Sequence, residues 1–205
     1  MSSALDIITG QGVVAIVRSA TPEVARDVVG VLIGAGVRAI EVSLVTPGAL
    51  DVIRETAASA PRGVAIGVGT ALTERDVVES ISAGASFIVS PVTREAVIRS
   101  ALDGGVTVLP GAATPTEALD AVEWGAELVK VFPASLWTPG ILAEVLAAMP
   151  FLRTVPTGGV SPTTAGDWVR AGAVAVGIGS ALSKSSDPAA TVSELFRSIS
   201  DARRV

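Results

Sequence analysis

One of the two lysines in this chain lies in a segment that otherwise predicts a buried strand. Lys130 stands in residues 126–133, among Val, Leu and Phe side chains, whereas Lys184 lies in a polar segment that predicts an exposed loop. An amine in such apolar surroundings is poorly hydrated, so its charged form is disfavoured. A neutral amine is a nucleophile that condenses with ketones. Lys130 therefore predicts Schiff-base chemistry; the alternative is a lysine that reaches past the strand end into solvent.

A carboxylate closes a second apolar segment. Glu41 follows the run 37–40 and precedes Val42, where a charge is costly unless it is paired or takes part in chemistry. Near a Schiff base it could remove and return protons through a water molecule. The alternative is a structural partner for an arginine or for Lys130. Glu127 stands at the start of its strand, so we interpret it as structural.

The composition narrows the possible chemistry. His, Cys and Tyr are all absent, so imidazole, thiol and phenol groups are excluded, as are a disulfide and a Cys/His zinc site. The net charge is −5 and the arginines are scattered, which argues against a nucleic acid partner. What remains is lysine, carboxylates, hydroxyls and backbone amides.

Hydrophobic residues make up 49% of the 205 residues, but Gly, Pro or a charge interrupts every apolar run before membrane-spanning length. The first residues lack the basic start of a signal peptide, so we expect a cytoplasmic protein without a membrane partner. The surplus apolar surface favours burial between subunits.

Short strands alternate with amphipathic helices along the whole chain. The strands are expected at 13–18, 37–42, 64–68, 86–90, 106–109, 127–132, 153–156 and 173–178. The helices are expected near 22–35, 47–59, 73–83, 92–104, 115–124, 139–148, 161–171 and 189–202. Eight such units predict one domain over residues 1–205, a parallel (β/α)8 TIM barrel with a short N-terminal helix in front. The alternative is an open doubly wound sheet, but residues 67–70 are only half of a dinucleotide-binding turn.

Several helix boundaries carry local signals. Five Thr-Pro or Ser-Pro pairs are typical of an N-cap followed by the first helical residue. They are Thr21-Pro22, Thr46-Pro47, Thr114-Pro115, Thr138-Pro139 and Ser161-Pro162. Helix ends are predicted at Gly36, Gly84, Gly104, Gly125 and Gly172.

In a barrel, chemistry gathers where the strands end. The polar residues expected at this end are Arg18, Glu41, Ser43, Thr70, Ser90, Lys130 and Thr157, followed by Gly158, Gly159, Gly179 and Ser180. The glycine-containing segments after the last two strands could hold a phosphate through backbone N–H groups. An arginine at a strand end suits a carboxylate or phosphate, or else a salt bridge at the rim. Threonine hydroxyls could donate to a substrate carboxylate.

Together these motifs resemble the 2-keto-3-deoxy-6-phosphogluconate (KDPG) aldolase family of class I pyruvate aldolases, over essentially the full length. The resemblance is carried by residues 40–44, 67–70, 88–91, 108–111, 129–134, 156–160 and 177–180. It implies that Lys130 forms a Schiff base with a keto-acid substrate and that Glu41 transfers protons. It implies that Thr70 helps to hold the pyruvate carboxylate and that Thr157 lines the site.

The resemblance also implies that Gly158, Gly159, Gly179 and Ser180 bind phosphate, that no cofactor or metal is needed, and that the protein is a homotrimer. The expected reaction cleaves a 2-keto-3-deoxy-6-phospho sugar acid to pyruvate and glyceraldehyde 3-phosphate. One position departs from the family pattern: many members carry an arginine where this chain has Val45, and Arg18 could bind the anion instead. The galactonate epimer and 4-hydroxy-2-oxoglutarate therefore stay open as substrates. Further alternatives are a trimeric scaffold without activity and another phosphate-binding barrel, an isomerase or a synthase.

Overall fold

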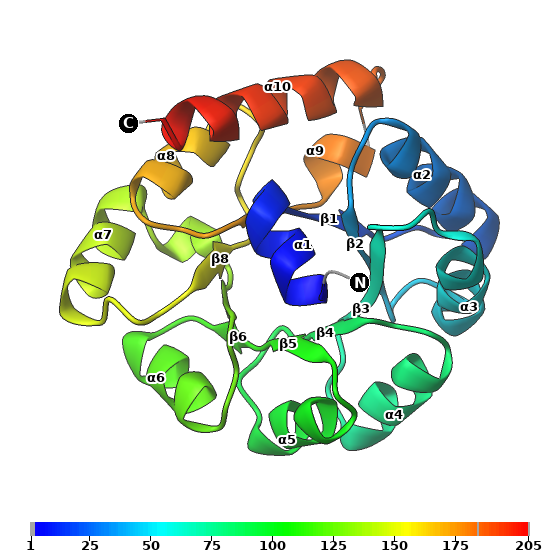
Figure 1. Cartoon of the computed structure of the whole chain (residues 1–205), viewed down its shortest axis with the longest axis horizontal. Coiled ribbons are helices and arrows are strands. Elements are labelled where there is room, and N and C mark those ends of the chain that lie inside the picture. The colour runs from blue at the N-terminus through cyan, green and yellow to red at the C-terminus, as the bar shows by residue number, and fades with distance from the viewer. Residues whose placement is uncertain (1–2, 184, 205) are drawn as a thin grey trace.

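The strands form the inside of a ring and the helices form its outside (Figure 1). We describe the protein from a computed structural model, which covers residues 3–183 and 185–204. Lys184, expected in an exposed loop, lies outside the described residues. Among those residues, no helix combines the length and apolar character that crossing a membrane requires.

All the strand pairs are parallel and belong to two sheets. The larger sheet has the order β5-β4-β3-β2-β1-β9 and the smaller one the order β6-β7-β8. The strands are β1 Val13–Val17, β2 Ala39–Ser43, β3 Ala65–Gly69, β4 Phe87–Val89, β5 Thr107–Leu109, β6 Gly111–Ala112, β7 Val129–Val131, β8 Thr154–Pro156 and β9 Val176–Ile178. Each of the predicted strand segments overlaps one of these strands, although β2 and β3 end one residue later than predicted. The predicted α/β class is confirmed, and its parallel sheet is curled.

The two sheets meet at two places. Pro110, which has no N–H to donate, separates β5 from β6, and its carbonyl accepts the Lys130 N–H at 2.9 Å. On the other side, an isolated bridge joins Thr157 to Gly177, and the Val174 N–H donates to the Thr154 carbonyl at 3.0 Å. The prediction placed a single strand at 106–109; the structure continues it past the proline as β6.

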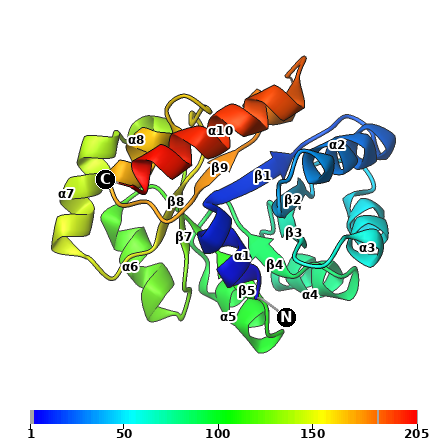
Figure 2. The same ribbon diagram turned by 45° about the horizontal axis from the view of Figure 1, so that its top comes forward.

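Helices follow the strands around the ring. They are α1 Ala4–Gln11, α2 Pro22–Gly34, α3 Ala49–Ser59, α4 Glu74–Ser82, α5 Glu95–Asp103, α6 Pro115–Glu123, η1 Ala134–Leu136, α7 Pro139–Ala148, α8 Ala165–Arg170, α9 Ser180–Ser183 and α10 Pro188–Ala202. The expected N-terminal helix, α1, lies across one opening of the ring (Figure 1). Its Ala4 and Ile8 are buried among inward-facing strand residues. The last helix, α10, runs along the outside beside α8 (Figure 2).

Alternating strand residues separate two cores. The inner core contains residues such as Val14, Phe87 and Leu128. The larger core lies between strands and helices and contains the neighbours of these residues in the sequence, such as Val13, Ile88 and Val129. Because successive side chains in a strand point to opposite faces, Lys130 shares the inward face with Leu128. The prediction that Lys130 points inward while its flanking valines face the helices is therefore confirmed.

Some helix boundaries differ from the prediction. Thr21, Thr114 and Thr138 cap helices as expected. The prediction for Thr46 is wrong, because its hydroxyl accepts the Ser19 N–H at 3.2 Å and α3 begins later, after Gly48.

The helix predicted from Ser161-Pro162 begins only at Ala165. Ser161 Oγ still accepts the Thr164 N–H at 3.2 Å, so the expected cap contact forms on a turn that precedes the helix. The four-residue α9 was not predicted. The helix end expected at Gly104 is in place, but Gly105 takes the left-handed conformation there, with φ 70°.

Candidate active site

Lys130 and Glu41 face each other inside the ring of strands. Lys130 is the central residue of β7 and is only 7% exposed; Glu41 lies in β2 and is 3% exposed. The Lys130 Nζ lies 3.9 Å from Glu41 Oε1 and 5.0 Å from the centroid of the Phe132 ring. The first distance exceeds the roughly 2.7–3.2 Å of a direct N–H···O hydrogen bond. The pair is therefore close enough for electrostatic coupling and leaves the amine able to react.

Burial raises the pKa of Glu41, because a carboxylate away from water favours its neutral form. The positive charges of Lys130 and, less strongly, Arg18 act in the opposite direction on the same pKa. A carboxyl group with a raised pKa beside an amine is suited to both accept and return a proton. The structure thus brings together the two residues for which the sequence predicted chemistry.

The end of β3 carries an unusual backbone conformation. Thr70 has φ 68°, a left-handed value that costs free energy for a β-branched residue. Its Oγ1 lies 2.7 Å from Ser43 Oγ, at the end of the neighbouring strand β2. Ser43 is fully buried. The Thr70 hydroxyl is therefore held at the end of β2, two residues beyond Glu41.

Thr157 lies buried just after β8, and its Oγ1 donates to the Val155 carbonyl at 3.1 Å. Gly158 and Gly159 follow with φ of 86° and 92°, values that L side chains rarely adopt. The Gly158 carbonyl accepts the Ser135 N–H at 3.0 Å, which joins this segment to η1. Both glycines are required by the turn itself.

Arg18, Gly179 and Ser180 lie at the same ends of β1 and β9. Arg18 is exposed and near enough for its charge to affect Glu41. Gly179 follows β9, and Ser180 is the first residue of α9. The other predicted binding residues therefore follow the carboxyl ends of their strands, the end that carries the active site in barrel enzymes, whereas Glu41 and Lys130 are the central residues of β2 and β7.

Glycines beside the site have a function that the motifs did not indicate. A Cβ on Gly177 would collide with Thr157 Oγ1, so this glycine makes room for the threonine across the β8–β9 junction. Ser43 and Phe132 were also missed as contacts of Thr70 and Lys130. The period of two in the strands could have found both, because Ser43 follows Glu41 by two residues and Phe132 follows Lys130 by two.

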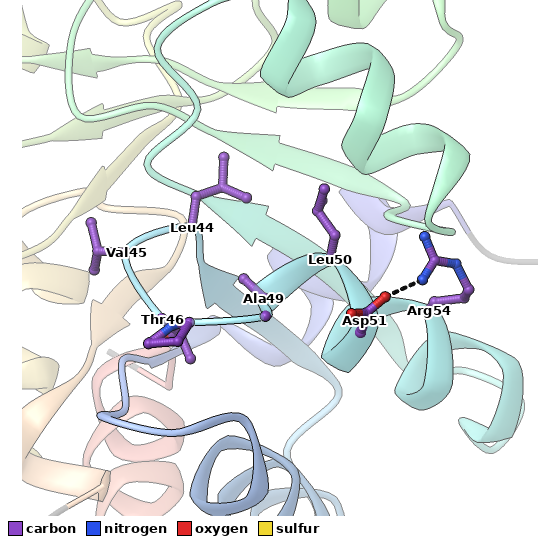
Figure 3. A pocket seen from close by; sticks show the side chains of 9 residues that line it. Leu44, Val45, Thr46, Ala49, Leu50, Asp51 and Arg54 are labelled. Atoms are coloured by element: carbon purple, nitrogen blue, oxygen red, sulfur yellow. Dashed lines mark hydrogen bonds and ion pairs between the residues drawn. The ribbon is translucent and has the colours of Figure 1, made fainter.

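Val45 lies in the loop between β2 and α3 and is 55% exposed. It lines a pocket together with Leu44, Thr46 and Leu50, and in Figure 3 the Val45 side chain points away from α3. The charged residues of this pocket, Asp51 and Arg54, pair with each other. Apart from Arg54, which lies in α3, the residues lining this pocket offer a substrate anion only backbone groups and the Thr46 hydroxyl. With Val45 in place of the arginine of many family members, this loop therefore supplies no positive side chain.

No cluster of three or more His, Asp or Glu residues within 3–183 and 185–204 is arranged to hold a metal ion.

Comparison with known proteins gives a consistent result. A family model described as KDPG and KHG aldolase matches residues 5–195. A probable 2-dehydro-3-deoxy-6-phosphogalactonate aldolase of Rhizobium meliloti is 40% identical over 83% of this chain and 81% of its own length. The 2-dehydro-3-deoxy-6-phosphogalactonate aldolase of Escherichia coli is 36% identical over 82% of this chain and 83% of its own. The KHG/KDPG aldolase of the same organism is 34% identical over 82% of this chain and 79% of its own length.

A solved structure described as native KDPGal has a TM-score of 0.88 and 32% identity over 94% of this chain and 96% of its own. The matched residues include Lys130, Glu41 and the strand ends that carry the other site residues. The relatives are aldolases, enzymes that cleave carbon–carbon bonds, and the chain belongs to the KDPG and KHG aldolase family.

Proposed function

We propose that this protein is a class I aldolase that cleaves a 2-keto-3-deoxy-6-phospho sugar acid to pyruvate and glyceraldehyde 3-phosphate through a Schiff base on Lys130. The observation that carries the proposal is the buried amine of Lys130, 3.9 Å from a buried carboxylate with a raised pKa. Amines in such sites form imines with carbonyl substrates. Glu41 is the acid and base of the reaction.

The reaction begins when Lys130 gives a proton to Glu41 and its neutral Nζ attacks the C2 ketone. Protons transferred through Glu41 allow the carbinolamine to lose water and become a protonated imine. Glu41 then accepts the proton of the C4 hydroxyl, the C3–C4 bond breaks, and its electrons pass to the imine nitrogen. The aldehyde leaves and an enamine remains. Protonation at C3 and attack of water on C2 release pyruvate and regenerate the amine.

The remaining site residues bind the substrate in this proposal. Thr70 donates its hydroxyl to the substrate carboxylate, with Ser43 as its partner, and Thr157 lines the site. Arg18 supplies positive charge for an anionic group, the function that Val45 cannot fulfil. The phosphate binds at Gly158, Gly159, Gly179 and Ser180, through their backbone N–H groups.

Two epimers of the substrate remain candidates. The sequence motifs led us to expect the gluconate-derived acid, whereas relatives that are 40% and 36% identical are named as phosphogalactonate aldolases. Both epimers would give the same products, because they differ only at C4, whose configuration is lost when it becomes the aldehyde carbon. The identity values favour the galactonate-derived acid.

The proposal also covers the closure and assembly of the molecule. We infer that the two sheets form one closed (β/α)8 barrel, supported by the Pro110 junction and the Thr157–Gly177 bridge. We further infer a cytoplasmic homotrimer. Contacts between subunits are supported by large exposed apolar side chains, including Leu136 at 66%, Phe151 at 55% and Val78 at 57%.

A pyruvate-release assay tests the proposed reaction. The purified protein is supplied with the two 6-phosphorylated epimers, their unphosphorylated forms and 4-hydroxy-2-oxoglutarate, and pyruvate is measured by coupling to lactate dehydrogenase. The proposal predicts the highest kcat/KM for a phosphorylated six-carbon acid. Faster cleavage of 4-hydroxy-2-oxoglutarate than of every phosphorylated acid would contradict the proposed substrate class, and no pyruvate from any of them would contradict the function.

A further inference from the structure

Glu41 lies against a glycine of the neighbouring strand. Gly69 ends β3 and is the register partner of Ser43, two residues beyond Glu41 on β2. An ideal Cβ built on Gly69 would collide with Glu41 Oε1, and it would lie 3.0 Å from Cδ and 3.5 Å from Cγ. The oxygen in that collision is the one that faces Lys130 at 3.9 Å.

We propose that Gly69 is a positioning residue for the reaction: the space left by its missing side chain determines where the Glu41 carboxylate lies relative to Lys130. This inference rests on the function proposed above, since it assigns a purpose to the position of Glu41. The proposal explains why a glycine stands in the fully buried strand β3. A glycine in a strand interior otherwise weakens the strand, because it has no side chain to pack against its neighbours. The backbone at Gly69 does not require glycine, because its φ is not in the left-handed region.

The neighbouring glycine of β3 distinguishes this function from ordinary core packing. A Cβ on Gly67 would lie 2.5 Å from atoms of the Phe87 ring, in the inner core. Gly67 therefore makes room for a hydrophobic side chain, and Gly69, one step further along the same face, makes room for the proposed acid–base group. A methyl group at position 69 would push against the carboxylate that pairs with Lys130.

A double-mutant cycle tests the proposal. Gly69→Ala should reduce kcat by about 100-fold or more, the lower end of what a general acid–base group contributes. Glu41→Asp shortens the side chain by one methylene and withdraws the carboxylate from the collision. Adding Gly69→Ala to Glu41→Asp should therefore cost less than about threefold, because the two changes share one contact and are not additive.

Gly30→Ala is the matched control, because a Cβ at this exposed position of α2 meets nothing within 4 Å. Its kcat should equal that of the wild type. Gly69→Ala should still yield the borohydride-reduced pyruvate adduct at Lys130 after long incubation, since the amine itself is untouched.

Equal losses from Gly69→Ala in the wild-type chain and in the Glu41→Asp variant would overturn the proposal, as would near-normal turnover of the single variant. If Gly69→Ala does not fold, adding Glu41→Ala to it should restore a cooperative thermal transition, because the side chain in the collision is removed. A double variant that still fails to fold would show that the methyl group collides with something other than Glu41, which would overturn the proposal. A wild-type protein that releases no pyruvate would instead contradict the proposed function.

Discussion

Replacing Glu41 by Gln tests the acid–base function with almost no change in shape. Glu41 Oε1 lies 3.9 Å from Lys130 Nζ, too far for a direct hydrogen bond. It can still exchange a proton with a substrate bound to the amine, either directly or through one bridging water. The amide keeps the volume and loses the ability to accept a proton. We expect kcat to fall by about 10²–10⁴-fold, the range for such groups, which corresponds to about 3–5 kcal/mol in the barrier.

The acid–base function of Glu41 also predicts how kcat changes with pH. Glu41 must be ionised to accept the C4 hydroxyl proton, so activity falls as the pH drops through its pKa. Burial raises that pKa above its ordinary 4.5, with Lys130 and Arg18 opposing. The acidic limb of kcat should therefore lie above pH 4.5 and should be absent from the residual activity of Glu41→Gln.

The assay is pyruvate release at saturating substrate across a pH series, with circular dichroism to verify the fold. Glu127→Gln is the matched control, because Glu127 is exposed and precedes β7 at the opposite end from the site. Its turnover should be unchanged. Glu41→Gln activity within about threefold of the wild type would remove Glu41 from the mechanism.

Three further substitutions probe the rest of the site. Arg18→Ala should raise KM for anionic substrates by about tenfold while kcat changes less; an unchanged KM for both phosphorylated and unphosphorylated acids would contradict its function in anion binding. Ser43→Ala removes the hydrogen-bond partner of Thr70 and should raise KM by about threefold to tenfold, the effect expected for the loss of one neutral hydrogen bond. A KM equal to that of the wild type would leave Ser43 without a function in binding. Gly177→Ala should displace Thr157 and lower kcat/KM by about tenfold, measured beside the melting temperature to separate misplacement from unfolding.

Much of the architecture could be predicted because the period of the strands is simple. Alternation alone placed Lys130 inward and its flanking valines outward. The closeness of Glu41 to Lys130, 3.9 Å between Oε1 and Nζ, was only one of the alternatives open for that carboxylate. Contacts between distant segments could not be predicted. Thr46 has the local pattern of a cap, but its hydroxyl binds the Ser19 N–H on another loop. Likewise, the sequence did not show why position 177 is a glycine, whereas its neighbour across the sheet, Thr157, explains it.

The left-handed backbone conformation of Thr70 also could not be predicted from the sequence, because the fold and not the local sequence determines it. A β-branched residue prefers extended conformations, so local propensity argues against φ 68°. The fold imposes the conformation, and the hydrogen bond to Ser43 accompanies it. Such conflicts between local preference and the whole fold concentrate at functional sites.

Trapping the covalent intermediate tests the central claim most directly. The protein is incubated with pyruvate and sodium borohydride, which reduces an imine to a stable secondary amine, and the modified peptide is located by mass spectrometry. We predict one adduct, on Lys130, with loss of activity in proportion to labelling and no adduct in Lys130→Ala. Labelling at Lys184 alone, or no labelling in a protein that releases pyruvate, would contradict the Schiff-base mechanism.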